Sequence, residues 1–420
     1  MLRVRCQSRA ANPRVPRAIR RYALTMAKKT AKKSPRKRPS KKDSVGDVTT
    51  LPRLPLPPVI PLGSVLGQAR AMSVIDRALA SERVHHAWLF HGPPGVGKCT
   101  AALAFAAALL DPEAGPGLAG AFETDPDSRV QRMVREGSHP ELHVIRKELT
   151  AFHPDSDVRK KTQQNIPIDV VRHFLIEPAT KTAVLRGGLA SKVFVVDEAE
   201  LLAFGRNNAQ NSLLKTLEEP PENTVVILVT SSEDKLLPTI RSRCQRVGFT
   251  PLDDKDMATW LDGWCRVRNL ELDPTHREWL LSFSAGSPGQ LETAHDDGLH
   301  AWWDRIEPML DRLAEGRPAI GLGAAMTELV DAWSSEWAKG GEKGLEQRSK
   351  SVANRLAFRR MAMLVAHHAR ARLTDDAARD WALGAMEALS RAEQLFSRQV
   401  QAGLVLEGLS SDLASPAQPV

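Results

Sequence analysis

Residues 91–100 read His-Gly-Pro-Pro-Gly-Val-Gly-Lys-Cys-Thr, which fits the phosphate-binding loop pattern of two glycines five positions apart followed by lysine. Apolar residues 88–90 precede this stretch and alanine-rich residues 101–110 follow it, so the strand and the helix that the motif requires are both present. In such a loop the glycines let backbone N–H groups converge on phosphate oxygens, and the lysine reaches the outer phosphates. The sequence therefore predicts an α/β domain with a parallel sheet, and its candidate phosphate-binding residues are Gly92, Gly95, Gly97 and Lys98.

One position of the loop departs from the pattern. The residue after Lys98 should be serine or threonine, whose hydroxyl binds Mg²⁺, but it is Cys99. A soft thiol is a poor ligand for a hard cation. Thr100 lies about 100° further round the helix and cannot simply substitute. We therefore expect Cys99 and Thr100 to lie beside a nucleotide in a loop that is suited to phosphate but compromised for metal-assisted hydrolysis.

A second informative stretch, Lys192–Glu198, has four consecutive apolar residues followed by two carboxylates, which is the Walker B pattern. A strand of this kind is buried on both faces, and its carboxyl end is where ligands bind in open α/β sheets. Asp197 is expected to hold Mg²⁺ through water and Glu198 to orient the attacking water. The pattern is weak alone but strong about 100 residues after a phosphate-binding loop. Residues 224–230 form another apolar strand, and its polar end makes Thr230 a further candidate nucleotide contact.

Composition and charge indicate how the N-terminal part of the 420-residue chain is organised. The net charge of +8 arises from residues 1–42, which hold 16 Lys and Arg with no acid and leave 42 basic against 50 acidic residues beyond. Residues 1–50 have almost nothing to bury and are expected to be a disordered basic tail, followed by a Pro-rich linker at 51–62. The tail is interpreted as a segment that touches nucleic acid or an acidic partner, as a solvated extension or mis-set start before Met26, or as a transit peptide.

Four scattered cysteines without CxxC spacing indicate neither a zinc cluster nor a disulfide framework and fit a reducing cytoplasm. No apolar run is long enough to span a bilayer. After residue 250 the pattern turns helical, and it predicts a small lid at 251–299, a helical bundle at 300–410 and a frayed end at 411–420. The lid's tryptophans are expected in the core rather than as platforms for bases.

Three stretches resemble signature segments of the clamp-loader AAA+ proteins. Residues 208–221 resemble the family's helix after Walker B, and residues 240–244 resemble its Ser-Arg-Cys motif. Residues 137–141 resemble the segment that these proteins carry ahead of their next strand. The resemblance runs from about Gly67 to Pro251, and it continues more loosely through the helices beyond. It implies an AAA+ nucleotide-binding domain at 63–250, with a helical lid and an all-α collar after it.

The resemblance also implies roles. Arg243 of the Ser-Arg-Cys motif is expected to act as an arginine finger on a neighbouring subunit's ATP. The bundle at 300–410 is expected to be the collar of a hetero-pentamer with the family's ATPase subunits, which loads a sliding clamp on primed DNA. Gly289 stands about where a hydrolysing subunit carries its sensor-2 arginine, and residues 111–137 lack the four cysteines of the zinc module found in bacterial relatives. We therefore expect no zinc, ATP that is weakly bound or not hydrolysed, and Mg²⁺ only together with nucleotide.

Two further interpretations stay open. The first is an active AAA+ ATPase acting on DNA, either a clamp-loader motor subunit or a branch-migration helicase, which the intact glycines, Lys98, Asp197 and Glu198 keep in play. The second is a small-molecule P-loop kinase, which has no use for an arginine facing a neighbour or for a long helical tail domain. Cys99 and Gly289 favour a subunit with little hydrolysis of its own over both.

Overall fold

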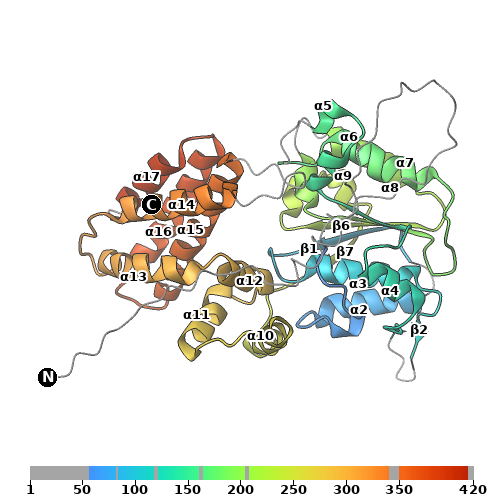
Figure 1. Ribbon diagram of the computed structural model, residues 1–420, viewed down its shortest axis with the longest axis horizontal. Helices are drawn as coiled ribbons and strands as arrows, with labels where there is room; N and C mark the ends of the chain where they lie inside the picture. The colour runs from blue at the N-terminus through green and yellow to red at the C-terminus, as the bar shows by residue number, and fades with distance from the viewer. Residues whose placement is uncertain are drawn as a thin grey trace, which may run out of the picture. The chain divides into compact units, whose positions relative to one another are not determined.

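Five parallel strands form the central sheet of the computed structural model, which describes residues 56–81, 84–117, 122–159, 164–203, 208–339 and 350–414 (Figure 1). The strand order is β4-β5-β6-β1-β7. The strands run over β1 Ala87–His91, β4 Leu142–Ile145, β5 Lys192–Val196, β6 Thr224–Thr230 and β7 Gln245–Gly248. All four pairings are parallel, so the carboxyl ends of the strands lie along one edge of the sheet. This confirms the expected α/β class with a parallel sheet.

Side chains of each strand alternate between two hydrophobic cores. On β1, Trp88 and Phe90 join one core, while Leu89 joins the other. The period of two follows from the pleat of a strand, and both faces are apolar because helices cover both. Figure 1 shows α2 and α3 on one side of the sheet and α6, α7 and α8 on the other. Their bounds are α2 Ala69–Ala80, α3 Lys98–Leu110, α6 Ile168–Val171, α7 Glu177–Thr180 and α8 Asn208–Glu218.

The helix behind the loop, α3, is buried on nearly its whole circumference. Its alanines let it approach the sheet closely, and a helix that is apolar all round needs cover on every side. Part of that cover comes from α4 Arg129–Arg135, which lies within residues 111–137. Ser128 caps α4, and the buried Asp111 carboxylate accepts hydrogen bonds from Ser128 Oγ at 2.6 Å and Gln131 Nε2 at 3.2 Å. The segment is therefore held by a buried polar cluster that the sequence pattern did not reveal.

Helices continue after the sheet as expected. They are α10 Asp254–Arg268, α11 Pro274–Ser284, α12 Pro288–Asp296, α13 Leu299–Ala314, α14 Leu322–Lys339, α15 Lys350–Arg372, α16 Arg379–Ser397 and α17 Ala402–Ala414. One hydrophobic core runs through both groups, α10–α12 and α13–α17, and it includes Trp264 and Trp279, which are core residues as expected. The end of the chain is ordered further than expected, because α17 reaches Ala414 with Leu413 fully buried.

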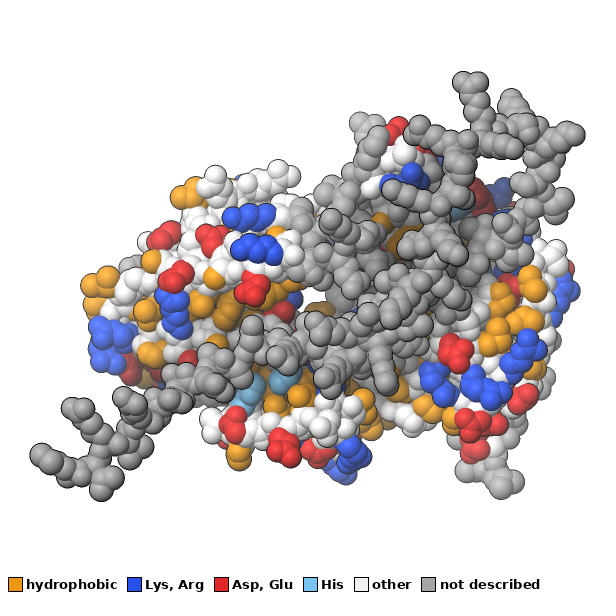
Figure 2. Space-filling view, in the orientation of Figure 1, with side chains coloured by type: hydrophobic (Ala, Val, Ile, Leu, Met, Phe, Trp, Pro, Cys, Tyr) orange, Lys and Arg blue, Asp and Glu red, His pale blue; other side chains and the backbone are white. Residues whose placement is uncertain are grey.

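The remaining features concern the N-terminal segments, membrane-spanning helices, surface charge and possible metal sites. The basic tail at 1–50 and the first part of the linker at 51–62 fall outside the described ranges. No helix in the described part of the chain is both long and apolar enough to cross a membrane. On the face drawn in Figure 2, acidic and basic side chains are interspersed over the described surface. Within the described ranges, no group of three or more His, Cys, Asp or Glu side chains is placed to hold a metal ion.

Candidate nucleotide-binding site

The loop predicted to bind phosphate connects β1 to α3, at the carboxyl edge of the sheet. Gly97 is the N-cap of α3 with φ of 99°, a left-handed conformation that glycine adopts without steric cost. The first backbone N–H groups of α3 have no partner within the helix and carry the positive end of its dipole. The strand, loop and helix predicted from the sequence are thus brought together as a phosphate-binding loop requires.

Lys98 folds back into this loop. Its Nζ donates to the carbonyl oxygens of Gly92 at 2.8 Å and Pro93 at 2.5 Å, and to Ser231 Oγ at 3.2 Å. The residue is only 5% exposed. Burial lowers its pKa to about 8, and the carboxylates of Glu200 and Asp197 oppose that shift. The ammonium is therefore held at the loop by neutral oxygens.

Each carboxylate of the Walker B pair is matched by a cation from the neighbouring strand. Arg146 donates to Asp197 Oδ2 from Nε at 2.9 Å and from Nη2 at 2.5 Å. Lys147 Nζ lies 2.5 Å from Glu198 Oε2. The pairing follows from the register of β4 and β5, in which Ile145 is opposite Val196, so that the two residues after each strand also face each other. The sequence analysis missed both cations.

Cys99 lies against the first of these pairs. Burial, together with the Asp197 carboxylate and against the opposing effect of Arg146, raises the pKa of its thiol to about 12. The side chain is therefore a neutral thiol at physiological pH, and a neutral thiol is not a metal ligand.

These residues do not fit a magnesium ion. Mg²⁺ requires near-octahedral oxygen coordination and is usually bound through one or two carboxylates plus phosphates. At the position where the motif has a hydroxyl, this chain has the thiol of Cys99. The Asp197 oxygen Oδ2 accepts two hydrogen bonds from Arg146. The expected water-mediated role of Asp197 is thus replaced by an ion pair, and the expectation of Mg²⁺ with nucleotide conflicts with the side chains around the site.

Thr230 is buried and hydrogen-bonded to a carboxylate of the same domain. Its Oγ1 donates to Glu200 Oε2 at 2.7 Å, and the residue is 1% exposed. The backbone N–H of Ser231 also points to the Glu200 carboxylate, at 3.3 Å from each oxygen. Ser231, one residue beyond the predicted contact, is the one that touches Lys98. The Glu200 carboxylate therefore organises the end of β6 without a ligand.

The helical lid touches the loop directly at Gly95. Gly289 N donates to Gly95 O at 2.9 Å, and Ser287 Oγ donates to Pro94 O at 3.0 Å. A Cβ atom on Gly289 would lie 2.8 Å from Gly95 Cα, closer than real contacts allow. Residue 289, the position expected for a sensor-2 arginine, is a glycine. The start of α12 can therefore pack directly against the loop.

Arg243 lies on a different part of the domain, between α9 Pro238–Arg241 and β7. Its Nη2 is 2.6 Å from Glu218 Oε1 at the end of α8, and its Nη1 donates to Thr239 O at 2.9 Å. The Arg243 side chain remains 36% exposed. Arg243 therefore has a local carboxylate partner in this chain, and the structure does not bring it to the phosphate-binding loop.

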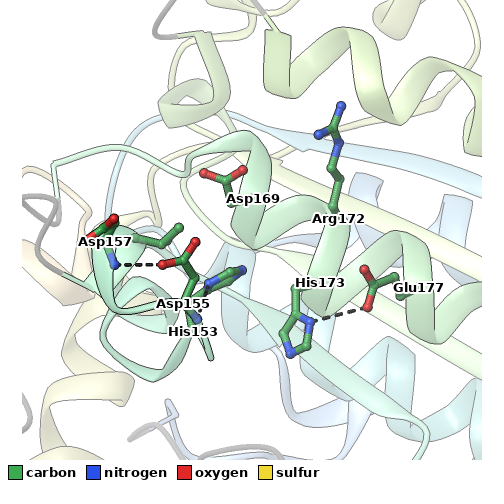
Figure 3. A pocket seen from close by; sticks show the side chains of 8 residues that line it. His153, Asp155, Asp157, Asp169, Arg172, His173 and Glu177 are labelled. Atoms are coloured by element: carbon green, nitrogen blue, oxygen red, sulfur yellow. Dashed lines mark hydrogen bonds and ion pairs between the residues drawn. The ribbon is translucent and has the colours of Figure 1, made fainter.

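A separate hollow of about 350 Å³ lies beside α6, and none of its lining residues belongs to the loop (Figure 3). Its polar lining comprises Arg172 together with four carboxylates and two histidines, namely Asp155, Asp157, Asp169, Glu177, His153 and His173. His173 Nδ1 lies 3.3 Å from Glu177 Oε2, within the same helical segment. None of these residues was predicted from the sequence as part of a site.

Comparison with known proteins identifies the family of this domain. Residues 67–253 match the family model described as DNA polymerase III, delta subunit. The DNA polymerase III subunit delta' of Bacillus subtilis is 34% identical over 190 residues, which are 45% of this chain and 49% of that protein. The delta' subunit of Pseudomonas aeruginosa is 30% identical over 251 residues, 60% of this chain and 66% of that protein.

A related subunit is also similar. The DNA polymerase III subunit tau of Bacillus subtilis is 28% identical over 222 residues, covering 53% of this chain and 35% of that protein. The chain thus spans about half to two thirds of the length of these delta' relatives, and the family model covers the sheet domain with its loop. Residues 67–253 belong to the clamp-loader subunits of DNA polymerase III, and they are of the delta-prime type.

Proposed function

We propose that this chain is the delta-prime-type subunit of a replicative clamp loader, with little ATP hydrolysis of its own. The observation that carries the proposal is the pairing of the Walker B aspartate, Asp197, with the shielded Arg146. Hydrolysis needs one carboxylate for the metal and one to orient water. With Asp197 engaged by Arg146 and a thiol at Cys99, the loop lacks the groups that would hold the metal.

The partners follow from the relatives. Proteins named subunit tau and subunit gamma/tau share the matched region, so we propose tau/gamma-type ATPase subunits and delta as the companions of this chain in a hetero-pentamer. The helices α13–α17 supply the collar through which the ring is held. The sliding clamp and primed DNA are reached through the complex, which acts in the cytoplasm at the replisome. Zinc has no role in this proposal.

Arg243 is the residue proposed to act on a neighbouring subunit. A guanidinium that reaches a γ-phosphate stabilises the charge that develops during transfer, and such fingers contribute roughly 10³ to 10⁵ in rate. Two features support the role: Arg243 is partly exposed, and its partner Glu218 is itself 47% exposed. A solvent-exposed ion pair contributes at most about 1 kcal/mol, so exchanging Glu218 for a phosphate costs little.

The test is clamp loading and ATP hydrolysis by a reconstituted complex that carries Arg243→Ala. We expect assembly to persist while hydrolysis by the adjacent subunit falls by at least tenfold. Arg243→Lys should not rescue, because lysine lacks the planar fork. Arg241→Ala should have the smaller effect.

Glu218→Gln is the matched control, because it breaks the same ion pair but keeps the arginine. If Arg243 acts in trans, Glu218→Gln complexes load clamps at the unmodified rate. If Arg243 only pairs locally, the two variants behave alike. Unmodified loading by Arg243→Ala complexes would leave the chain an architectural subunit.

A further inference from the structure

We propose that Arg146 takes the place of the divalent cation in this phosphate-binding loop, so that the loop binds a nucleoside di- or triphosphate without Mg²⁺. The inference shares with the proposed function the assignment of residues 92–98 as a phosphate-binding loop. It does not depend on assembly with other subunits or on Arg243.

Geometry places the guanidinium at the Walker B aspartate. Arg146 is the first residue after β4, and the register with β5 sets it opposite Asp197. The backbone N–H of Asp197 donates to Ile145 O at 3.0 Å, which fixes this juxtaposition through the main chain. Nε and Nη2 then both reach Oδ2. Charge-assisted bonds of this kind are about twice as strong as neutral ones.

The pair is shielded from solvent. The Arg146 side chain is 23% exposed and that of Asp197 is 13% exposed. Arginine does not lose its proton in proteins. Arg146 therefore gives the site a permanent positive charge at every physiological pH.

A metal ion gains little by displacing this charge. Mg²⁺ gives up its water reluctantly and needs oxygen ligands in octahedral geometry. Here it would have to remove Arg146 from Asp197 Oδ2, and it would find the soft sulfur of Cys99 in place of a hydroxyl oxygen. If the guanidinium stayed, two cations would share one carboxylate.

For phosphate groups, by contrast, the site offers positively charged side chains. Lys98 and Arg146 are the cations beside the loop, and Arg146 already neutralises the aspartate that would otherwise repel a phosphate. A guanidinium suits phosphate because its N–H groups form a planar fork. Such a site takes the phosphate groups and leaves out the metal, and it lacks the activated water that hydrolysis requires.

The experiment is titration calorimetry of the full chain with ADP and with ATP, once in excess Mg²⁺ and once in EDTA. We expect dissociation constants that agree within about threefold between the two conditions. Thermal unfolding with and without nucleotide provides a second readout, in which the stabilisation by nucleotide should be the same in Mg²⁺ and in EDTA.

Arg146→Met tests the residue itself. It removes the charge, so binding in EDTA should weaken by about tenfold or more, and Mg²⁺ should restore part of the affinity because Asp197 becomes free. Arg360→Met is the matched control, since Arg360 Nε also holds a shielded carboxylate, Asp297, at 2.5 Å, with side chains 14% and 18% exposed. It lies on α15, outside the loop, and should leave nucleotide affinity and its metal independence unchanged.

Two results would overturn the proposal. A tenfold or greater loss of affinity by the unmodified chain in EDTA would show that the metal is used. The absence of binding by ADP and ATP at millimolar concentration in both conditions would show that the loop takes no nucleoside phosphate. Both measurements use the unmodified chain, so they stand even if Arg146→Met does not fold. Neither result bears on clamp-loader assembly, which reconstitution tests separately.

Discussion

The contact between Gly289 and Gly95 makes a sharp prediction about the lid. Gly289→Ala adds a Cβ atom that would lie 2.8 Å from Gly95 Cα and 3.3 Å from Gly95 O. Both neighbours are backbone atoms of the loop and cannot rotate away. The lid must therefore shift, and the hydrogen bond from Gly289 N to Gly95 O, now 2.9 Å long, must lengthen.

Two opposing terms set the magnitude. Overpacking of this kind costs about 1 to 3 kcal/mol, whereas replacing glycine by alanine in a helix gains about 0.5 to 1 kcal/mol. The net expectation for Gly289→Ala is a loss of about 1 to 2 kcal/mol. Gly263→Ala in α10 is the matched control, because no atom lies within 4 Å of its Cβ position. Gly263→Ala should therefore show only the gain in stability that comes from replacing glycine by alanine in a helix.

Differential scanning fluorimetry and hydrogen exchange check this prediction. A loss of about 1 to 2 kcal/mol lowers the melting temperature by about 1 to 3 °C in a body of this size. The amide of Gly289 should exchange about tenfold faster if its opening becomes 1.4 kcal/mol easier. If Gly289→Ala proves as stable as Gly263→Ala, and its amide exchange is unchanged at residues 287–290, the lid is not seated on the loop in solution.

Two further predictions concern turnover and pH. Steady-state ATP hydrolysis by the isolated chain should be far below about one per second; a rate at or above that value which disappears in Lys98→Ala would instead identify an active AAA+ motor. Stability should fall as pH drops from about 6.5 towards 4, because burial lowers the pKa of His139, His143 and His367 to about 4 each. Between these pH values the unfolded chain binds protons that the folded chain refuses. Urea unfolding across this range measures the loss, and a flat profile would contradict it.

The sequence predicted the elements that carry strong periodicity or a motif. The loop, α3, β5 and β6 all lie where expected, because a fully buried strand or helix is apolar without interruption. It did not predict β7, because three of its four residues are exposed and only Val247 is buried. An edge strand of that kind has too little apolar signal to stand out from a loop.

A motif indicates which residues are candidates for the site, but it does not show which partners the fold brings to them from elsewhere in the chain. Thr230 was expected to face a nucleotide, but its hydroxyl donates to Glu200, which lies 30 residues earlier in the chain. Arg243 was given a role towards another chain, and the structure shows the local partner Glu218, 25 residues away. No sequence pattern distinguishes Glu200 or Glu218 from a glutamate on the solvent-exposed surface.

The pairing of Arg146 and Lys147 with the Walker B carboxylates is a different case, because it can be predicted from the register of the two strands. The strand at 142–145 is followed by two basic residues, Arg146 and Lys147, and its parallel neighbour at 192–196 is followed by two acidic ones, Asp197 and Glu198. Once the strands are assigned as adjacent and their carboxyl ends aligned, the pairs 146–197 and 147–198 follow without any further information. A Walker B acid should therefore be assessed together with the residue that ends the strand beside it. In this chain that residue is Arg146, so the Asp197 carboxylate already has a cation before any ligand binds.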